Sequence, residues 1–120
     1  MTRQTDVDTL LPLKPVELEL LLALVDEERH GYALVQQIAE RTGGLVRLEP
    51  GNLYRVIKRL LADGLVQESS RRTVSDGAER RRYYRLTAHG ARVVDADLRR
   101  MRALLASAPA RSLVRRLGPA

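Results

Sequence analysis

Residues 49–64 read EPGNLYRVIKRLLADG, and this stretch predicts the short helix around which the rest of the chain is organised. Its apolar residues recur at intervals of three and four, as on a helix with one side against a core. They are Leu53, Val56, Ile57, Leu60 and Leu61. Pro50 suits the first turn of a helix, and Gly64 suits the position just past its end. The opposite side is basic, bears an amide, and is small at its N-terminal end.

That polar side predicts contact with double-stranded DNA. Arginine can form two hydrogen bonds with guanine, and asparagine can do so with adenine, in the major groove. The candidate residues on this helix are Gly51, Asn52, Tyr54, Arg55, Lys58 and Arg59. We expect Asn52 and Arg55 to read base edges, while the lysine, Arg59 and the tyrosine fix the register on phosphates. For an isolated helix a solvated basic side is the simpler interpretation, so the flanking sequence decides.

Composition excludes several classes of function. The chain has 120 residues, enough for one domain or one domain with an extension, and its 44% hydrophobic and 30% charged residues are typical of a globular protein. No apolar run reaches the length of a membrane span, and the first 13 residues lack the apolar centre of a signal peptide, so we expect a cytoplasmic protein that does not contact membranes. With no Cys and two separated His, we expect no metal and no cofactor. The absence of Phe and Trp argues against stacking on single-stranded nucleic acid.

Charge is divided unevenly along the chain. Residues 1–48 hold five Lys or Arg against eight Asp or Glu, a balance of −3. Residues 49–120 hold sixteen against seven, a balance of +9. The basic surplus therefore begins at the helix described above, which indicates one side of the molecule that faces a polyanion.

The order of the other elements predicts a winged helix-turn-helix. A nearly all-apolar helix follows Pro15, a second helix spans Tyr32 to Thr42, and the third helix follows after a short connection. Residues 65–68 and 82–86 have the composition of strands, and the segment between them is rich in arginine. We call this predicted hairpin the wing. Its arginines are Arg71, Arg72, Arg80, Arg81 and Arg82.

A last helix is predicted from Ala88 to about Ala106, with Thr87 as its N-cap. Apolar residues recur along it at spacings of 3, 4, 3 and 4, as in the seam of a coiled coil. These seam residues are Ala91, Val94, Leu98, Met101 and Leu105. We expect them to pair two copies of the chain, although a helix folded back on its own domain is the alternative. Beyond Pro109 we expect a short tail with at most a turn or two of helix.

Four short motifs together resemble the PadR family of bacterial transcriptional regulators across roughly residues 13–106. They are His30-Gly31-Tyr32, Gly51-Asn52-Leu53-Tyr54, Asp63-Gly64-Leu65-Val66, and Tyr84-x-Leu86-Thr87-x-x-Gly90. The resemblance implies a winged-helix dimer that binds near-palindromic operator DNA and usually represses. It also implies that Tyr32, at the start of the second helix, joins the third helix and the wing in contacting DNA. Some members sense planar aromatic compounds through Trp at the dimer interface, and this chain has no Trp.

The expected fold class is therefore mainly α with a small β-hairpin. We expect a flexible N-terminal arm over residues 1–13, a winged helix-turn-helix domain over 14–87, a C-terminal dimerisation helix over 88–108 and a short tail over 109–120. A small apolar effector of unknown identity would bind between the arm, the first helix and the last helix. The two histidines are expected at the surface.

Two other functions remain open. A winged helix can serve as a protein–protein interaction module, but the basic wing and the divided charge argue against that. A DNA-associated protein without sequence preference would need only the electrostatic part of the interface. An enzyme has almost no support, because the chain lacks a Cys nucleophile, a metal cluster and a phosphate-binding glycine loop, and Asp95 and Asp97 do not face each other on one helix.

Overall fold

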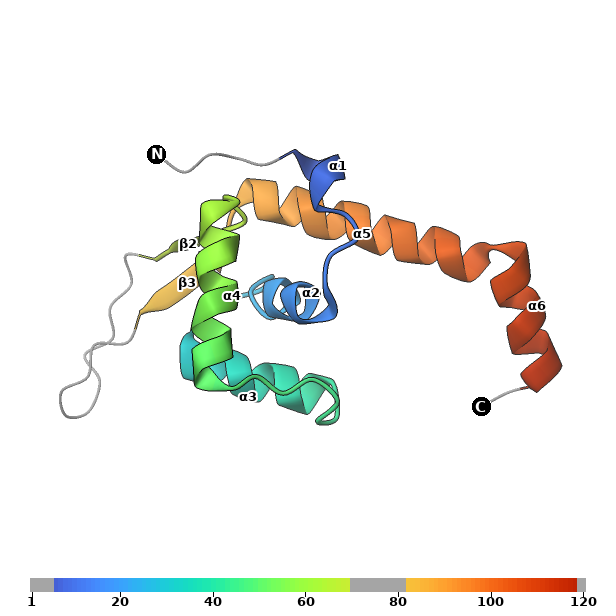
Figure 1. Ribbon diagram of the computed structural model, residues 1–120, viewed down its shortest axis with the longest axis horizontal. Helices are drawn as coiled ribbons and strands as arrows, with labels where there is room; N and C mark the ends of the chain where they lie inside the picture. Colours follow the sequence, from blue (N-terminus) through green and yellow to red (C-terminus); the bar gives the residue numbers. More distant parts are fainter. Residues whose placement is uncertain (1–5, 70–81, 119–120) are drawn as a thin grey trace.

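The computed structural model describes residues 6–69 and 82–118. Figure 1 shows α2, α3 and α4 gathered beneath a long α5, with β2 and β3 beside the upper end of α4. In chain order the elements are α1 (Val7–Leu10), α2 (Pro15–Leu22), β1 (Arg29–His30), α3 (Gly31–Arg41), α4 (Pro50–Ala62), β2 (Val66–Glu68), β3 (Tyr83–Leu86), α5 (Ala88–Ala106) and α6 (Ala108–Leu117).

The strands form one antiparallel sheet in the order β1-β3-β2. In β1, Arg29 lies opposite Tyr84, and in β2, Val66 lies opposite Leu86. Helices α2, α3 and α4 followed by the paired strands β2 and β3, with β1 before α3 added to the same sheet, make a winged helix-turn-helix, so the predicted fold class is confirmed. The strand β1 was not predicted, because two residues within a charged turn carry no alternating pattern.

The apolar side of α4 forms the centre of the core. Leu53, Ile57 and Leu60 are buried in the predicted pattern and join buried leucines of α2 and α3. Burial of this stripe stabilises α4 by roughly 1.5–3 kcal/mol for each large side chain. The core thereby holds α4 with its polar side outward, which is the orientation that the sequence predicts.

The junction between the wing and α5 is tightly built. The Thr87 hydroxyl accepts a hydrogen bond from the Gly90 amide, as an N-cap does, and donates to the carbonyl of Gly64 at 2.6 Å. A Cβ at Gly90 would lie 2.1 Å from the carbonyl oxygen of Leu65, so only glycine fits there. In the Thr-x-x-Gly motif, therefore, Thr87 caps α5 and Gly90 allows α5 to pack closely on Leu65, which fixes where α5 leaves the domain.

Residues 6–13 and 107–117 are more structured than the sequence predicts. We predicted a flexible arm over residues 1–13, but Asp6 caps α1, α1 packs against α5, and Leu13 is buried in the core. The apolar run from Leu10 to Leu13 explains this difference, because it has core surface to cover. We predicted a tail over 109–120, but Ser107 caps α6 and Pro109 lies in its first turn, where proline is accommodated.

Candidate nucleic-acid interface

The polar side of α4 is open to solvent along its length. Gly51, Tyr54, Arg55, Lys58 and Arg59 are exposed, and Asn52 is half-buried. A Cβ at Gly51 would meet nothing within 4 Å, so the backbone at the start of this side is bare. The predicted DNA-contacting residues of the third helix are therefore all accessible on one element.

Asn52 and Arg55 form a hydrogen-bonded pair near the N-terminus of α4. The Arg55 Nη2 donates to the Asn52 Oδ1 at 2.6 Å. Arginine has five N–H donors and an amide oxygen has two lone pairs, so each side chain keeps donors or acceptors for another partner. The contact orients the two side chains against each other and reduces the rotamer entropy that binding would cost.

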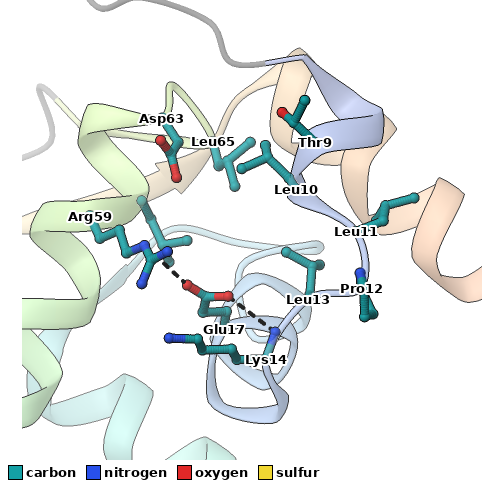
Figure 2. A pocket seen from close by; sticks show the side chains of 11 residues that line it. Thr9, Leu10, Leu11, Pro12, Leu13, Lys14, Glu17, Arg59, Asp63 and Leu65 are labelled. Carbon is teal, nitrogen blue, oxygen red and sulfur yellow. Dashed lines mark hydrogen bonds and ion pairs between the residues drawn. The ribbon is translucent and has the colours of Figure 1, made fainter.

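Lys58 and Arg59 are adjacent on α4 but differ in whether a carboxylate pairs with them. The Arg59 Nε lies 3.8 Å from the Glu17 Oε2 of α2, and Figure 2 shows the guanidinium directed toward that carboxylate. Glu17 also accepts a hydrogen bond from the Lys14 backbone amide at 3.1 Å. Lys58 makes no ion pair or hydrogen bond within residues 6–69 and 82–118. Only Lys58 of these two cations is free of a competing carboxylate.

Two tyrosines flank the N-terminal part of α4. Gly31 begins α3, and a Cβ there would lie 3.2 Å from the Tyr54 hydroxyl, so the start of α3 is held against α4. Tyr32, the next residue, is exposed, and its hydroxyl accepts a hydrogen bond from the Gln36 amide at 3.0 Å. Tyr32 therefore belongs to the same end of the surface as Asn52 and Arg55.

Only the base of the wing lies in the described residues. Arg82 is exposed there and its Nε lies 3.6 Å from the Glu68 Oε1 across the hairpin. Burial raises the pKa of Tyr84 between these strands, and the nearby Glu68 carboxylate raises it further. The predicted contacts Arg71, Arg72, Arg80 and Arg81 lie outside the described residues.

The structure divides the five predicted seam residues between a buried and an exposed stripe that lie next to each other on α5. Val94 is 4% exposed and packs in the core of its own chain, and Met101 is partly buried against that core. Ala91, Leu98 and Leu105 are exposed, Leu98 by 43% and Leu105 by 71%. Val94 therefore serves its own domain, and the surface available to a second copy repeats every seven residues.

The histidines do not lie where they were expected. His89 is buried at the start of α5. His30 is half-buried, where its Nδ1 accepts a hydrogen bond from the Ala33 amide and caps α3. In residues 6–69 and 82–118, no group of three His, Asp or Glu side chains is placed to hold a metal. Within the same residues no helix is long and apolar enough to cross a membrane.

A cavity of about 160 Å³ lies between the N-terminal segment, α2 and α4. Figure 2 shows Leu10, Leu13 and Leu65 around it, with Glu17 and Arg59 on its polar side. We expected an effector space between the arm, the first helix and the last helix, and this cavity borders α4 in place of α5. Glu17 was missed by sequence reasoning, because its contact with Arg59 spans 42 positions and no local pattern links them.

Comparison with known proteins agrees with this arrangement. Residues 20–96 match the model of the transcriptional regulator PadR-like family. The transcriptional regulator Rv3488 of Mycobacterium tuberculosis is 39% identical over 89 residues, which cover 74% of this chain and 78% of that protein. An uncharacterised protein of Lysinibacillus sphaericus is 34% identical over 71 residues, and the match covers 59% of this chain and 63% of that protein.

Solved structures show the same fold. Bacillus subtilis PadR in complex with operator DNA has a TM-score of 0.62 at 22% identity, over 72% of this chain and 48% of that one. RosR of H. salinarum has a TM-score of 0.64 at 26% identity, over 90% of this chain and 92% of that one. The match to the family model and the match to Rv3488 confirm the predicted regulator and the expectation that the chain is not an enzyme. The chain belongs to the PadR family of transcriptional regulators.

Proposed function

We propose that this regulator binds a near-palindromic operator as a homodimer in the cytoplasm and represses transcription, with α4 of each copy in the major groove. The observation that carries the proposal is the exposed side of α4, on which the Asn52–Arg55 pair lies next to bare backbone at Gly51. Bacillus subtilis PadR, whose fold this chain shares, was solved with operator DNA, which supports the same use of the fold here.

The contacts of the individual side chains support different roles along α4. Asn52 and Arg55 lie nearest the N-terminus of the helix and present amide and guanidinium groups to base edges. Lys58, Tyr54 and Tyr32 surround them and bind phosphates, which fixes the register without reading sequence. Arg59 contributes less than Lys58, because Glu17 already offsets part of its charge.

The wing supplies the remaining positive charge. Its arginines, from Arg71 to Arg82, follow the DNA backbone or enter the adjacent minor groove, where guanidinium groups respond to groove width. The exposed seam residues Ala91, Leu98 and Leu105 join two copies, and the distance between the α4 helices of the two copies then sets the spacing of the half-sites. A small apolar effector in the cavity beside Glu17 would change the position of Arg59 and so alter DNA binding.

A fluorescence-anisotropy titration tests the proposal. The purified protein is titrated against DNA from its own upstream region and against a scrambled duplex, at two salt concentrations. We expect tight, salt-sensitive binding that prefers the upstream fragment. Arg55→Ala should weaken that binding by about 1–3 kcal/mol and relax one operator position, whereas Arg81→Ala should weaken all sequences alike and flatten the salt slope by about one unit.

Two outcomes would support the alternatives. Equal affinity for both duplexes, unchanged by Arg55→Ala, leaves only the electrostatic contribution and indicates a protein that binds DNA without sequence preference. An absence of binding to either duplex at low salt would overturn the DNA-binding function. The winged helix would then be a protein–protein interaction module.

A further inference from the structure

α6 carries an apolar surface that nothing in its own chain covers. Leu113, Val114 and Leu117 are exposed by more than half, and at 100° per residue they share one side of the helix. Arg111 and Arg116 flank that side, and Arg115 lies opposite it. A ten-residue helix is only marginally stable alone, so this one needs a surface to pack on.

A groove of opposite charge lies at the other end of α5. Its volume is about 370 Å³, and it runs between the end of α2 and the start of α5. Leu24, Val25, Leu86, Ala88 and Ala91 give it apolar walls, and Val25 is 52% exposed. We call it the acidic groove, because three carboxylates line it against one guanidinium; these are Asp26, Glu27 and Glu28 against Arg85.

Two of the three carboxylates that line the acidic groove already have partners in their own chain. Glu27 lies 3.0 Å from Arg29, and Glu28 accepts a hydrogen bond from the Ser69 hydroxyl. Asp26 has neither an ion pair nor a hydrogen bond within the part of the chain that the structure describes. The groove therefore offers exposed apolar surface beside an available carboxylate, which complements the leucines and flanking arginines of α6.

A chain cannot place its own α6 in its own acidic groove. α5 separates the two, and its 19 residues span about 28 Å at 1.5 Å per residue. Figure 1 shows α5 straight, with α6 turning away at its far end. An α6 that fills the groove would therefore belong to a second copy.

The exposed side of α5 decides how two copies align. Ala91, Leu98 and Leu105 repeat every seven residues, so antiparallel pairing centred on Leu98 places Ala91 of one copy opposite Leu105 of the other. The same alignment places Asp95, which pairs with Arg99 of its own chain at 2.9 Å, beside the opposite charge of Arg102 of the second copy. In a parallel pair Asp95 and Arg102 of the two copies would lie on opposite sides of the seam, so this attraction would be absent.

We propose that two copies pair antiparallel through α5 and that α6 of each copy docks in the acidic groove of the other; this rests on the proposed dimer. Antiparallel pairing brings the end of one α5 next to the start of the other, where the groove opens at Ala91. The two-fold symmetry fills both grooves at once. The exposed seam alone offers few residues compared with the 20–30 on each side of a typical interface, and α6 with the acidic groove would enlarge the contact.

Thiol crosslinking tests the direction of pairing, because the chain has no Cys. In the antiparallel dimer, a mixture of Ala91→Cys and Leu105→Cys chains should crosslink with a short bifunctional reagent, and Leu98→Cys should crosslink alone. Neither of the first two variants should crosslink alone, because their thiols would be separated by fourteen residues of helix, about 21 Å. Crosslinking of Ala91→Cys alone and of Leu105→Cys alone would indicate parallel pairing and overturn the proposal.

Sedimentation of charge-reversal variants tests the docking of α6. Arg116→Glu should weaken dimerisation roughly threefold to tenfold. The neighbouring Arg115→Glu makes the same charge change on the opposite side and should not. Adding Asp26→Lys to Arg116→Glu should restore the dimer, and Leu117→Ser should weaken it without changing the helix content of the monomer. Equal dimer affinity in all four variants would exclude α6 from the groove.

These outcomes are separate from failure of the proposed function. A wild-type chain that sediments as a monomer at every concentration would overturn both the docking and the dimer, whether or not it binds DNA. An antiparallel dimer that is weakened by Arg116→Glu but binds no DNA would leave the docking intact and overturn the DNA-binding function. The operator titration and the sedimentation experiment therefore report on different claims.

Discussion

Replacing Gly90 by alanine should destabilise the fold at the point where α5 leaves the winged domain. The added Cβ would lie 2.1 Å from the carbonyl oxygen of Leu65 and 2.8 Å from the Cδ1 of Leu86. The first of these atoms is backbone, so it cannot turn aside as a flexible side chain can. Either α5 or the turn before β2 must move.

The expected loss of stability can be worked out from the hydrogen bonds and packing that this movement would disturb. The Leu65 carbonyl accepts a hydrogen bond from the Thr87 amide at 3.0 Å, and it shares the proton of the Thr87 hydroxyl with the closer Gly64 carbonyl. Overpacking costs about 1–3 kcal/mol, and the two contacts to Leu65 together are worth about 1–2 kcal/mol net. About 0.5–1 kcal/mol of this cost is offset, because alanine has a higher helix propensity than glycine. We expect Gly90→Ala to lower the free energy of unfolding by about 2–4 kcal/mol, a large share of the roughly 5–15 kcal/mol typical of a domain.

Urea denaturation followed by circular dichroism measures this change, and Gly51→Ala is the matched control. Gly51 also lies in a helix, but a Cβ there meets nothing within 4 Å, so the control should keep or slightly raise the stability of the wild type. The same control should bind the operator less tightly if the bare backbone at Gly51 approaches DNA. A Gly90→Ala protein as stable as the Gly51→Ala protein would refute the packing argument.

Three further predictions concern charge. Lys58→Ala should flatten the dependence of log affinity on log salt by about one unit, and Arg59→Ala by less, because Glu17 pairs with Arg59; equal slopes would contradict this. Arg100→Met should lower the free energy of unfolding by about 1–3 kcal/mol, since it leaves the buried carboxylate of Asp97 without its 2.8 Å partner, and adding Asp97→Asn should restore most of the loss in a double-mutant cycle. Burial raises the pKa of Tyr84, so the folded state favours the neutral phenol, and stability is complete below about pH 10 but lost as the pH rises from there toward the folded pKa. Tyr84→Phe should show a smaller loss in alkaline denaturation, and identical pH profiles would contradict the assignment.

Elements with a regular apolar period were predictable from the sequence. The stripe from Leu53 to Leu61 predicted α4 and its orientation, and Thr87 marked the start of α5 correctly. The two strands of the wing followed from β-branched and aromatic residues near Gly64 and Tyr84. In each case the local pattern and the packing of the whole chain favour the same structure, which is the condition under which local patterns are informative.

Features that depend on distant contacts were not predictable. The strand β1 exists because Arg29 and His30 pair with a segment more than fifty residues later. Glu17 meets Arg59 only because α2 and α4 are brought together by the core. The N-terminal segment was expected to be loose, yet Leu13 finds a place in a core that other elements create. No local pattern encodes any of these contacts.

The seam of α5 shows why a correct period can still assign residues to the wrong surface. Spacings of three and four describe a helix side that packs on something, and they hold equally for a partner helix and for the chain's own core. On α5 both are present: Val94 and Met101 turn to the core, while Leu98 and Leu105, each four residues later and so about 40° further around the helix, remain exposed. The sequence joined the two sets because they are neighbours around the helix. Only burial separates them, and once it does, the exposed set has the strict seven-residue repeat that a second helix requires.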